Sequence, residues 1–192
     1  MMLDDILADE FAAAAAAVKR EDFDYLRAQG VPRQWLWGGP MRFGIAEIIT
    51  SGPTYQPVRG GKRAVVVPAI PLRDDLLDDD PGDLIAWFPD NPSRWWCRYG
   101  TVPFLNYEAV ERAAFFHEPL SLWSSPTAWL QASGRGAVIL EPNTHLSLWL
   151  GDIATIEFDK ADLARQVRAK MTAEERRLPE FRVLADTVEA AE

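Results

Sequence analysis

Three carboxylates in the C-terminal half of the chain have the residue type and the positions to hold a metal ion. Glu141 directly follows a predicted strand over residues 136–140, and Glu157 and Asp159 end the next one, over residues 153–158. Because functional groups gather at the carboxyl ends of parallel strands, these side chains could bind Mg²⁺ for phosphodiester hydrolysis. A plainer interpretation makes Asp159 a helix cap and leaves Glu141 in an ordinary strand–helix turn.

A run of aspartates forms a second candidate site, and its members are Asp74, Asp75, Asp78, Asp79, Asp80 and Asp83. A calcium loop needs acids at alternating positions and a glycine in the sixth, whereas Gly82 is fifth when counted from Asp78. Such runs are usually solvated loops. The sharper hypothesis is that Asp78, Asp79 and Asp80 belong to a surface that imitates the charge spacing of a phosphate backbone.

A basic cluster surrounds a Gly-Gly pair and consists of Arg59, Lys62 and Arg63. Cations and backbone N–H groups around a glycine turn could together contact a phosphate. The cluster lacks the Gly-Lys-Ser/Thr sequence of a Walker loop, and a basic turn is more often simply solvated. It is therefore a secondary candidate for phosphate binding.

The chain offers little for nucleophilic catalysis. Cys97 is the only cysteine, and His117 and His145 are the only histidines. A catalytic nucleophile needs a base and an orienting group within hydrogen-bond reach, whereas Cys97 lies mid-strand and is typical of a small buried hydrophobe. A lone cysteine also excludes an intrachain disulfide and a multi-cysteine zinc site. We expect no catalytic residues and no cofactor.

Tryptophan is the most unusual part of the composition, and the eight residues are Trp35, Trp37, Trp87, Trp95, Trp96, Trp123, Trp129 and Trp149. Each indole can bury a large apolar area and carries one N–H that needs a partner. The plain interpretation is a tryptophan-rich core.

Two functional interpretations of the aromatic residues stay open. A platform for single-stranded nucleic acid would combine Trp35, Trp37, Trp87, Trp95 and Trp96 with Arg33, Arg42, Arg94 and Arg98. A protein–protein hot spot would use the same residue types, since Trp, Tyr and Arg dominate such patches.

The first half of the chain predicts a helical segment followed by antiparallel hairpins. Apolar residues recur at three- and four-residue steps over residues 3–29, which indicates helix with a break near Glu21–Asp22. A Gly-Gly pair between strand-like runs at 54–59 and 62–70 predicts one hairpin. A second hairpin joins strands over residues 83–88 and 94–100.

The second half alternates strands and helices. Strands are predicted over residues 120–123, 136–140 and 153–158, and short right-handed crossovers would place them side by side and largely parallel. Residues 172–175 have the pattern of a capping box that begins a last helix. The predicted fold class is α+β, with one mixed β-sheet of N-terminal antiparallel hairpins and a C-terminal βαβαβα alternation, flanked by helices. We expect residues 1–30 to pack as a helical segment on a single domain over residues 31–192.

Charge and length limit the classes of protein. The net charge of −9 argues against a broad phosphate-binding surface. The chain begins with acids rather than the basic residues of a secretory signal, and no stretch approaches the ~18 apolar residues of a membrane span. We expect a cytoplasmic protein with no membrane partner. Its general style resembles proteins of bacterial mobile elements, although no motif carries that resemblance.

These observations favour a non-catalytic protein-interaction module with an aromatic and acidic surface, formed by Trp87, Trp95, Trp96, Arg98 and the aspartates at 78–80. The expected partner is another protein, and a nucleic acid stays open. The alternatives are a metal-dependent phosphoesterase or nuclease that uses Glu141, Glu157 and Asp159, and a single-stranded nucleic-acid binder.

Overall fold

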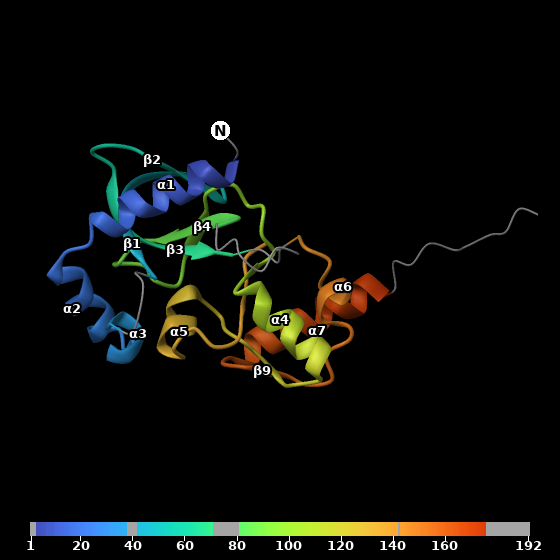
Figure 1. Ribbon diagram of the computed structural model, residues 1–192. Coiled ribbons are helices and arrows are strands. Elements are labelled where there is room, and N and C mark those ends of the chain that lie inside the picture. The colour runs from blue at the N-terminus through green and yellow to red at the C-terminus, as the bar shows by residue number, and fades with distance from the viewer. Residues whose placement is uncertain (1–2, 38–41, 71–80, 142, 176–192) are drawn as a thin grey trace, which may run out of the picture.

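The N-terminal half of the computed structural model folds into a small closed barrel (Figure 1). The structure describes residues 3–37, 42–70, 81–141 and 143–175. The barrel strands are β1 (Gly44–Ser51), β2 (Thr54–Pro57), β3 (Lys62–Ala69), β4 (Asp83–Trp87) and β5 (Trp95–Cys97), and they close in the order β1-β2-β5-β4-β3. All neighbours are antiparallel except β2 and β5, which meet in parallel where Thr54 pairs with Cys97.

Helices cover the barrel, which explains why β3 and β4 carry apolar residues on both faces. All five residues of β4 are buried. Leu7 of α1 (Leu3–Ala16) packs into one group of core side chains with Ile48 and Tyr55. A second group contains residues of α2 (Arg20–Ala28), α3 (Arg33–Trp37) and α5 (Pro126–Gln131). A strand that is buried on both faces reads as a continuous apolar run rather than an alternating one.

The Gly-Gly pair does not form the predicted hairpin between β2 and β3. Both strands pair with β1, so Ile48 has Pro57 as its partner on one side and Lys62 on the other. The connection crosses β1, and a Cβ at Gly61 would lie only 2.7 Å from the carbonyl oxygen of Ile48. Glycine is needed there because the two backbones approach closely, which is a different cause from the turn geometry that predicts a hairpin. The second hairpin is confirmed, since Trp87 pairs with Trp95.

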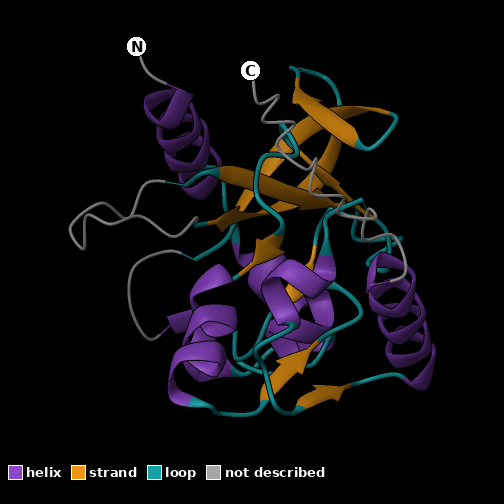
Figure 2. Cartoon of the chain, turned by 90° about the vertical axis from the view of Figure 1, so that its right-hand side faces the viewer, coloured by secondary structure: helices purple, strands orange, loops and turns teal. Residues whose placement is uncertain are grey.

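The C-terminal half contains the predicted alternation of strands and helices. Its elements are β6 (Phe104–Leu105), α4 (Tyr107–Phe116), β7 (Leu120–Leu122), α5, β8 (Val138–Ile139), α6 (Leu146–Leu150), β9 (Ile156–Phe158) and α7 (Ala161–Glu175). β7 pairs in parallel with β9, and a parallel bridge joins Leu122 to Ala137. β8 pairs with β6 in the antiparallel direction. The β7–β9 pair lies at the opposite end of the molecule from the barrel (Figures 1 and 2).

The α+β class, with antiparallel and parallel pairing in one chain, is confirmed. The strands are distributed over the barrel and two two-stranded sheets. The predicted helix over residues 3–29 breaks between Ala16 and Arg20, slightly earlier than expected. The predicted capping box at residues 172–175 is wrong, because α7 continues through these positions; the last predicted helix lies outside the described residues. Among the described residues, no helix is long and apolar enough to cross a membrane.

Candidate interaction groove

Two pockets share lining residues at the edge of the barrel: one lies between β5 and helix α7, and the other between the barrel and the loop that follows β8. Their cavity volumes are about 390 and 350 Å³, and Trp95 and Leu140 line both of them. Each volume falls within the range of about 300–1,000 Å³ that is usual for ligand pockets. We call the larger one the α7 pocket, the smaller one the β5 pocket, and both together the Trp95 groove.

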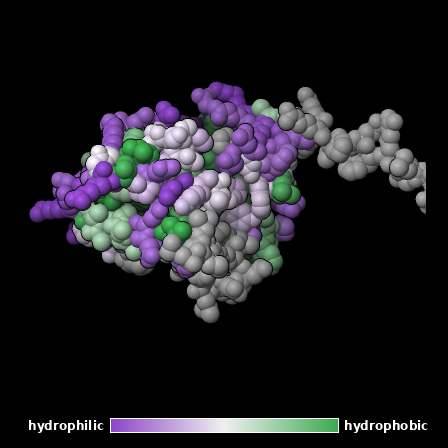
Figure 3. All heavy atoms as spheres, turned by 90° about the horizontal axis from the view of Figure 1, so that it is seen from above, coloured by the Kyte–Doolittle hydropathy of each residue, from purple (hydrophilic) through white to green (hydrophobic). Residues whose placement is uncertain are grey.

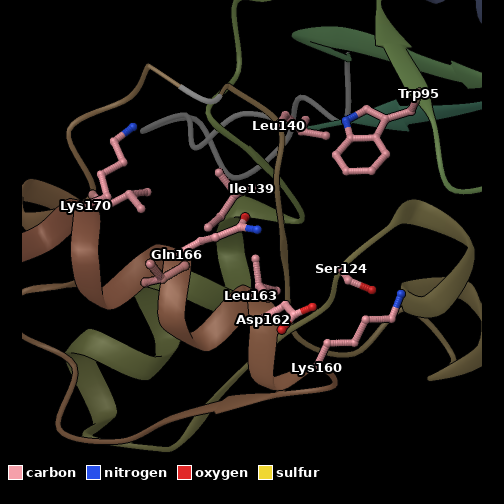
Figure 4. A pocket seen from close by; sticks show the side chains of 11 residues that line it. Trp95, Ser124, Ile139, Leu140, Lys160, Asp162, Leu163, Gln166 and Lys170 are labelled. Atoms are coloured by element: carbon pink, nitrogen blue, oxygen red, sulfur yellow. The ribbon is translucent and has the colours of Figure 1, made fainter.

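The α7 pocket has an apolar floor and a charged rim (Figure 4). Its apolar lining residues are Trp95, Ile139, Leu140, Leu146, Leu163 and Val167. On α7, residues 162, 163, 166, 167 and 170 follow helical spacing and therefore present one face to the cavity. Lys160 and Lys170 stand at the rim with Asp162, Gln166 and Ser124.

The β5 pocket is more polar and combines aromatic rings with a carboxylate. Its lining residues are Pro53, Thr54, Ser93, Arg94, Trp95, Cys97, Tyr99, Gly100, Leu140 and Glu141. Trp95 and Cys97 share a face of β5 because side chains alternate along a strand. The loop that follows β8 brings Glu141 to this wall, where its Oε1 accepts a hydrogen bond from the backbone N–H of Asn143 at 2.8 Å.

The base of the β5 pocket is electrostatically negative. Burial, together with the smaller effect of the Asp83 and Glu141 charges, raises the pKa of the Cys97 thiol to about 12. Asp83 is fully buried, and its carboxylate accepts hydrogen bonds from the backbone N–H groups of Leu84, Tyr99, Gly100 and Thr101. The thiol is therefore protonated at neutral pH and is not a nucleophile.

The arginines beside the β5 pocket already have intramolecular contacts. The guanidinium of Arg94 lies over the Trp96 ring, 4.9 Å from its centroid. Arg98 binds both carboxylate oxygens of Glu10 at 2.9 and 3.0 Å, and this pairing raises the pKa of its guanidinium. Arg98 also covers the ring of Tyr99 at 4.4 Å. Its role is to join α1 to the barrel.

The structure separates the tryptophans that the sequence groups together. Trp87 is fully buried and Trp96 is nearly so, which removes both rings from any surface. Trp95 is half-buried in the groove. Trp37 is 56 % exposed and stacks on Phe23 with 4.3 Å between the ring centroids. These positions do not form a continuous stacking platform for nucleic acid.

Two further tryptophans, Trp123 and Trp129, donate hydrogen bonds to the backbone of one turn. The indole N–H of Trp123 donates to the carbonyl of Arg135 at 2.6 Å, and that of Trp129 donates to Gly136 at 3.1 Å. The side-chain amide of Asn106 donates to Gly134 and Gly136 at 3.1 and 2.8 Å. These tryptophans therefore use their polar N–H groups inside the fold.

The three carboxylates of the predicted metal site do not converge. The ladder places Glu157 beside Ser121 of β7, whose hydroxyl donates to it at 3.3 Å. Asp159 accepts from the backbone N–H and the hydroxyl of Ser124 at 3.0 and 2.7 Å. Glu141 lies in the β5 pocket instead. In the part of the chain that the structure describes, no three His, Cys, Asp or Glu side chains are placed to hold a metal ion.

The basic cluster is largely neutralised by acids of its own chain. Arg63 binds the buried Asp22 at 2.6 Å and lies 3.5 Å from Glu21, while Lys62 binds Asp90 at 2.6 Å. Arg59 is exposed. Because two of the three predicted phosphate ligands already form ion pairs, the cluster presents less positive charge than its sequence indicates.

The remaining candidates lie elsewhere. Asp78, Asp79 and Asp80 are outside the described residues. His117 ends α4 in a left-handed conformation and His145 precedes α6, and both are exposed. The exposed large apolar side chains are Trp37, Ile49, Val58, Ile70, Tyr99, Phe115, Phe116 and Leu148. On the face shown in Figure 3 the apolar residues form separate groups among hydrophilic ones.

Comparison of the chain with protein-family models, with curated proteins and with solved structures finds no match. The site therefore rests on its own geometry. Sequence patterns point to Trp95 but miss Tyr99, Leu140 and the role of Glu141 beside Trp95. The one available signal is the alternation that puts Trp95 and Cys97 on one face of β5, and Tyr99 follows the end of that strand.

Proposed function

We propose that this protein is a non-catalytic interaction module that binds a segment of another protein in the Trp95 groove. The observation that carries the proposal is the position of Trp95, whose half-buried ring lines both pockets. Large aromatic side chains in the centre of a contact surface, surrounded by polar residues, are typical of protein–protein hot spots. The apolar floor with its charged rim fits this pattern.

The geometry supports the two alternative functions less well. The proposed metal ligands Glu157 and Asp159 are engaged with serines of the neighbouring strand and its following loop. The arginines of the proposed nucleic-acid platform are engaged too, since Arg94 covers Trp96 and Arg98 binds Glu10. The net charge of −9 also opposes a polyanionic ligand.

A photo-crosslinking residue at Ser93, on the rim of the β5 pocket, tests the proposal. We expect it to capture a discrete protein partner, and we expect Trp95→Ala to abolish this capture. The same residue placed at exposed Glu108 on α4, outside the groove, serves as the matched control. The captured partner is then purified and titrated against the wild type and Trp95→Ala, with near-ultraviolet circular dichroism to confirm the native fold.

Capture that is equally strong with Trp95→Ala would contradict the proposal. So would salt-dependent quenching of tryptophan fluorescence by a single-stranded oligonucleotide that Trp95→Ala removes, because this response belongs to the nucleic-acid alternative.

A further inference from the structure

We propose that the β5 pocket receives a cationic side chain, lysine or arginine, from the partner segment, and that the α7 pocket receives an apolar side chain from the same segment. This inference rests on the proposed function and adds the chemical class of the ligand. It also assigns a recognition role to Glu141, which the sequence places in a metal site instead.

The lining of the β5 pocket contains the groups that recognise an organic cation. Trp95 supplies an aromatic ring, and a cation within about 6 Å of a ring centroid is attracted by the ring quadrupole. Tyr99 supplies a second ring, one face of which Arg98 already covers. Glu141 supplies a carboxylate, which forms charge-assisted hydrogen bonds with ammonium or guanidinium groups. Thr54, whose hydroxyl can accept a hydrogen bond, also lines the pocket. A cavity of about 350 Å³ has room for one long side chain.

The charges near the β5 pocket also favour a positively charged ligand. Glu141 lines the wall, and the buried Asp83 acts on Cys97 at its base. The hydrogen-bond partners of Asp83 among the described residues are backbone N–H groups, which carry no full charge. Over a longer range, the net charge of −9 attracts a basic partner and increases its rate of association.

Arg94 is the opposing charge on the wall. Its guanidinium lies over the ring of Trp96. Because side chains alternate along a strand, Trp96 points to the opposite face of β5 from Trp95. The other nearby arginine, Arg98, is compensated by Glu10 at 2.9 Å. The structure thus contains one carboxylate and one guanidinium whose removal must change the affinity for a charged ligand in opposite directions.

The α7 pocket continues from Trp95 with an apolar surface formed by β8, α6 and α7 (Figure 4). Burying an apolar side chain there removes apolar surface from water, which favours binding. Lys160 and Lys170 also line this pocket, and long side chains of this kind can lay their apolar stems along an apolar surface while the ammonium groups stay in water. An extended segment with a basic residue two positions from an apolar one therefore matches the two pockets together, because residues two apart share one face.

Titration with small probes tests the charge of the ligand. The probes are N-acetyl-arginine amide, N-acetyl-glutamate amide and N-acetyl-leucine amide, and the readout is the indole N–H resonance of Trp95, assigned through Trp95→Phe. We expect the arginine probe to shift this resonance and the glutamate probe to leave it unchanged. Glu141→Gln should weaken binding of the arginine probe about two- to five-fold, and Arg94→Gln should tighten it by a similar factor, as for partly exposed ion pairs.

Glu157→Gln is the matched control, because it removes an exposed carboxylate outside the groove and should leave the affinity unchanged. A shift of the Trp95 resonance by the glutamate probe overturns the cationic class. So does tighter binding of the arginine probe by Glu141→Gln together with weaker binding by Arg94→Gln. A response to the leucine probe alone also overturns it and leaves the groove as a binding site. Without any response the inference fails, and the crosslinking experiment alone then decides the proposed function.

Discussion

The indole N–H of Trp123 donates a 2.6 Å hydrogen bond to the backbone carbonyl of Arg135. This bond joins β7 to a turn in which Ser133, Gly134 and Gly136 all have positive φ angles. Trp129 and Asn106 donate to the same turn. Tryptophan is thus used here as a donor that fixes an irregular backbone, in addition to its use as an apolar ring.

Replacing Trp123 tests this role. Trp123→Phe keeps an aromatic ring but removes the donor to Arg135, and it should lower the free energy of unfolding by about 1 kcal/mol. Urea denaturation followed by far-ultraviolet circular dichroism measures the change. Trp37→Phe, at an exposed ring that stacks on Phe23, is the control and should be nearly neutral. Equal losses from both variants would show that the Trp123 hydrogen bond contributes little.

Gly136→Ala should be one of the most destabilising single substitutions. Its φ of +72° disfavours a side chain, and a Cβ would overlap the carbonyl oxygen of Ser121 and lie 2.9 Å from Trp123 Nε1. Backbone strain and overpacking together should cost about 3 kcal/mol. Gly52→Ala is the matched control, because its φ of +59° is similar but the space around it is open. It should cost only about 1 kcal/mol, and both losses are measured by thermal unfolding.

Glu174 makes the packing of α7 on α6 dependent on pH. Its carboxylate accepts from the backbone N–H groups of Leu146 and Ser147 and from the Ser147 hydroxyl. Desolvation alone would raise the pKa of Glu174, but these bonds and the charge of Lys170 lower it below its ordinary value of 4.5. The contribution to stability is therefore complete above the pKa of the unfolded chain and is lost as the pH falls through the lower folded pKa.

Thermal unfolding of the wild type and Glu174→Gln between pH 7 and pH 3 measures this dependence. The two melting temperatures should differ at pH 7 and approach each other in the acidic range. Glu108→Gln, at an exposed position on α4, should follow the wild type throughout. A difference between the wild type and Glu174→Gln that stays constant down to pH 3 would argue against the carboxylate as its source.

Cys97 should react slowly although it lines the β5 pocket. Its pKa of about 12 leaves only a very small thiolate fraction at pH 8, and the thiolate is the reactive species. The reaction with a disulfide reagent at pH 8 should be about a hundred-fold or more slower in the native protein than in urea. Similar rates in the two states would mean that the thiol is neither protonated nor buried as the structure places it.

Local patterns in the sequence determined the elements of this protein well. The β4–β5 hairpin, the alternation of strands and helices after residue 104, and the parallel pairing of β7 with β9 follow from turn residues, apolar periodicity and the crossover rule. Prediction from local patterns failed where the same sequence feature can arise from either of two physical causes. Gly61 has no side chain because β1 passes beneath it, and the residues at 172–175 continue a helix whose Glu174 caps α6.

The tertiary structure alone decided which chemistry-bearing residues share a site. Closure of the barrel buries Trp87 and Trp96 and leaves Trp95 at the boundary with α7. The packing of α1 on the barrel pairs Arg98 with Glu10 from 88 positions earlier in the chain, and the loop after β8 carries Glu141 to the β5 pocket, which Trp95 also lines. The amino-acid types and their alternation are local properties, so the sequence by itself specified them. Which charges neutralise each other depends on contacts between distant segments, and no local pattern contains those distances.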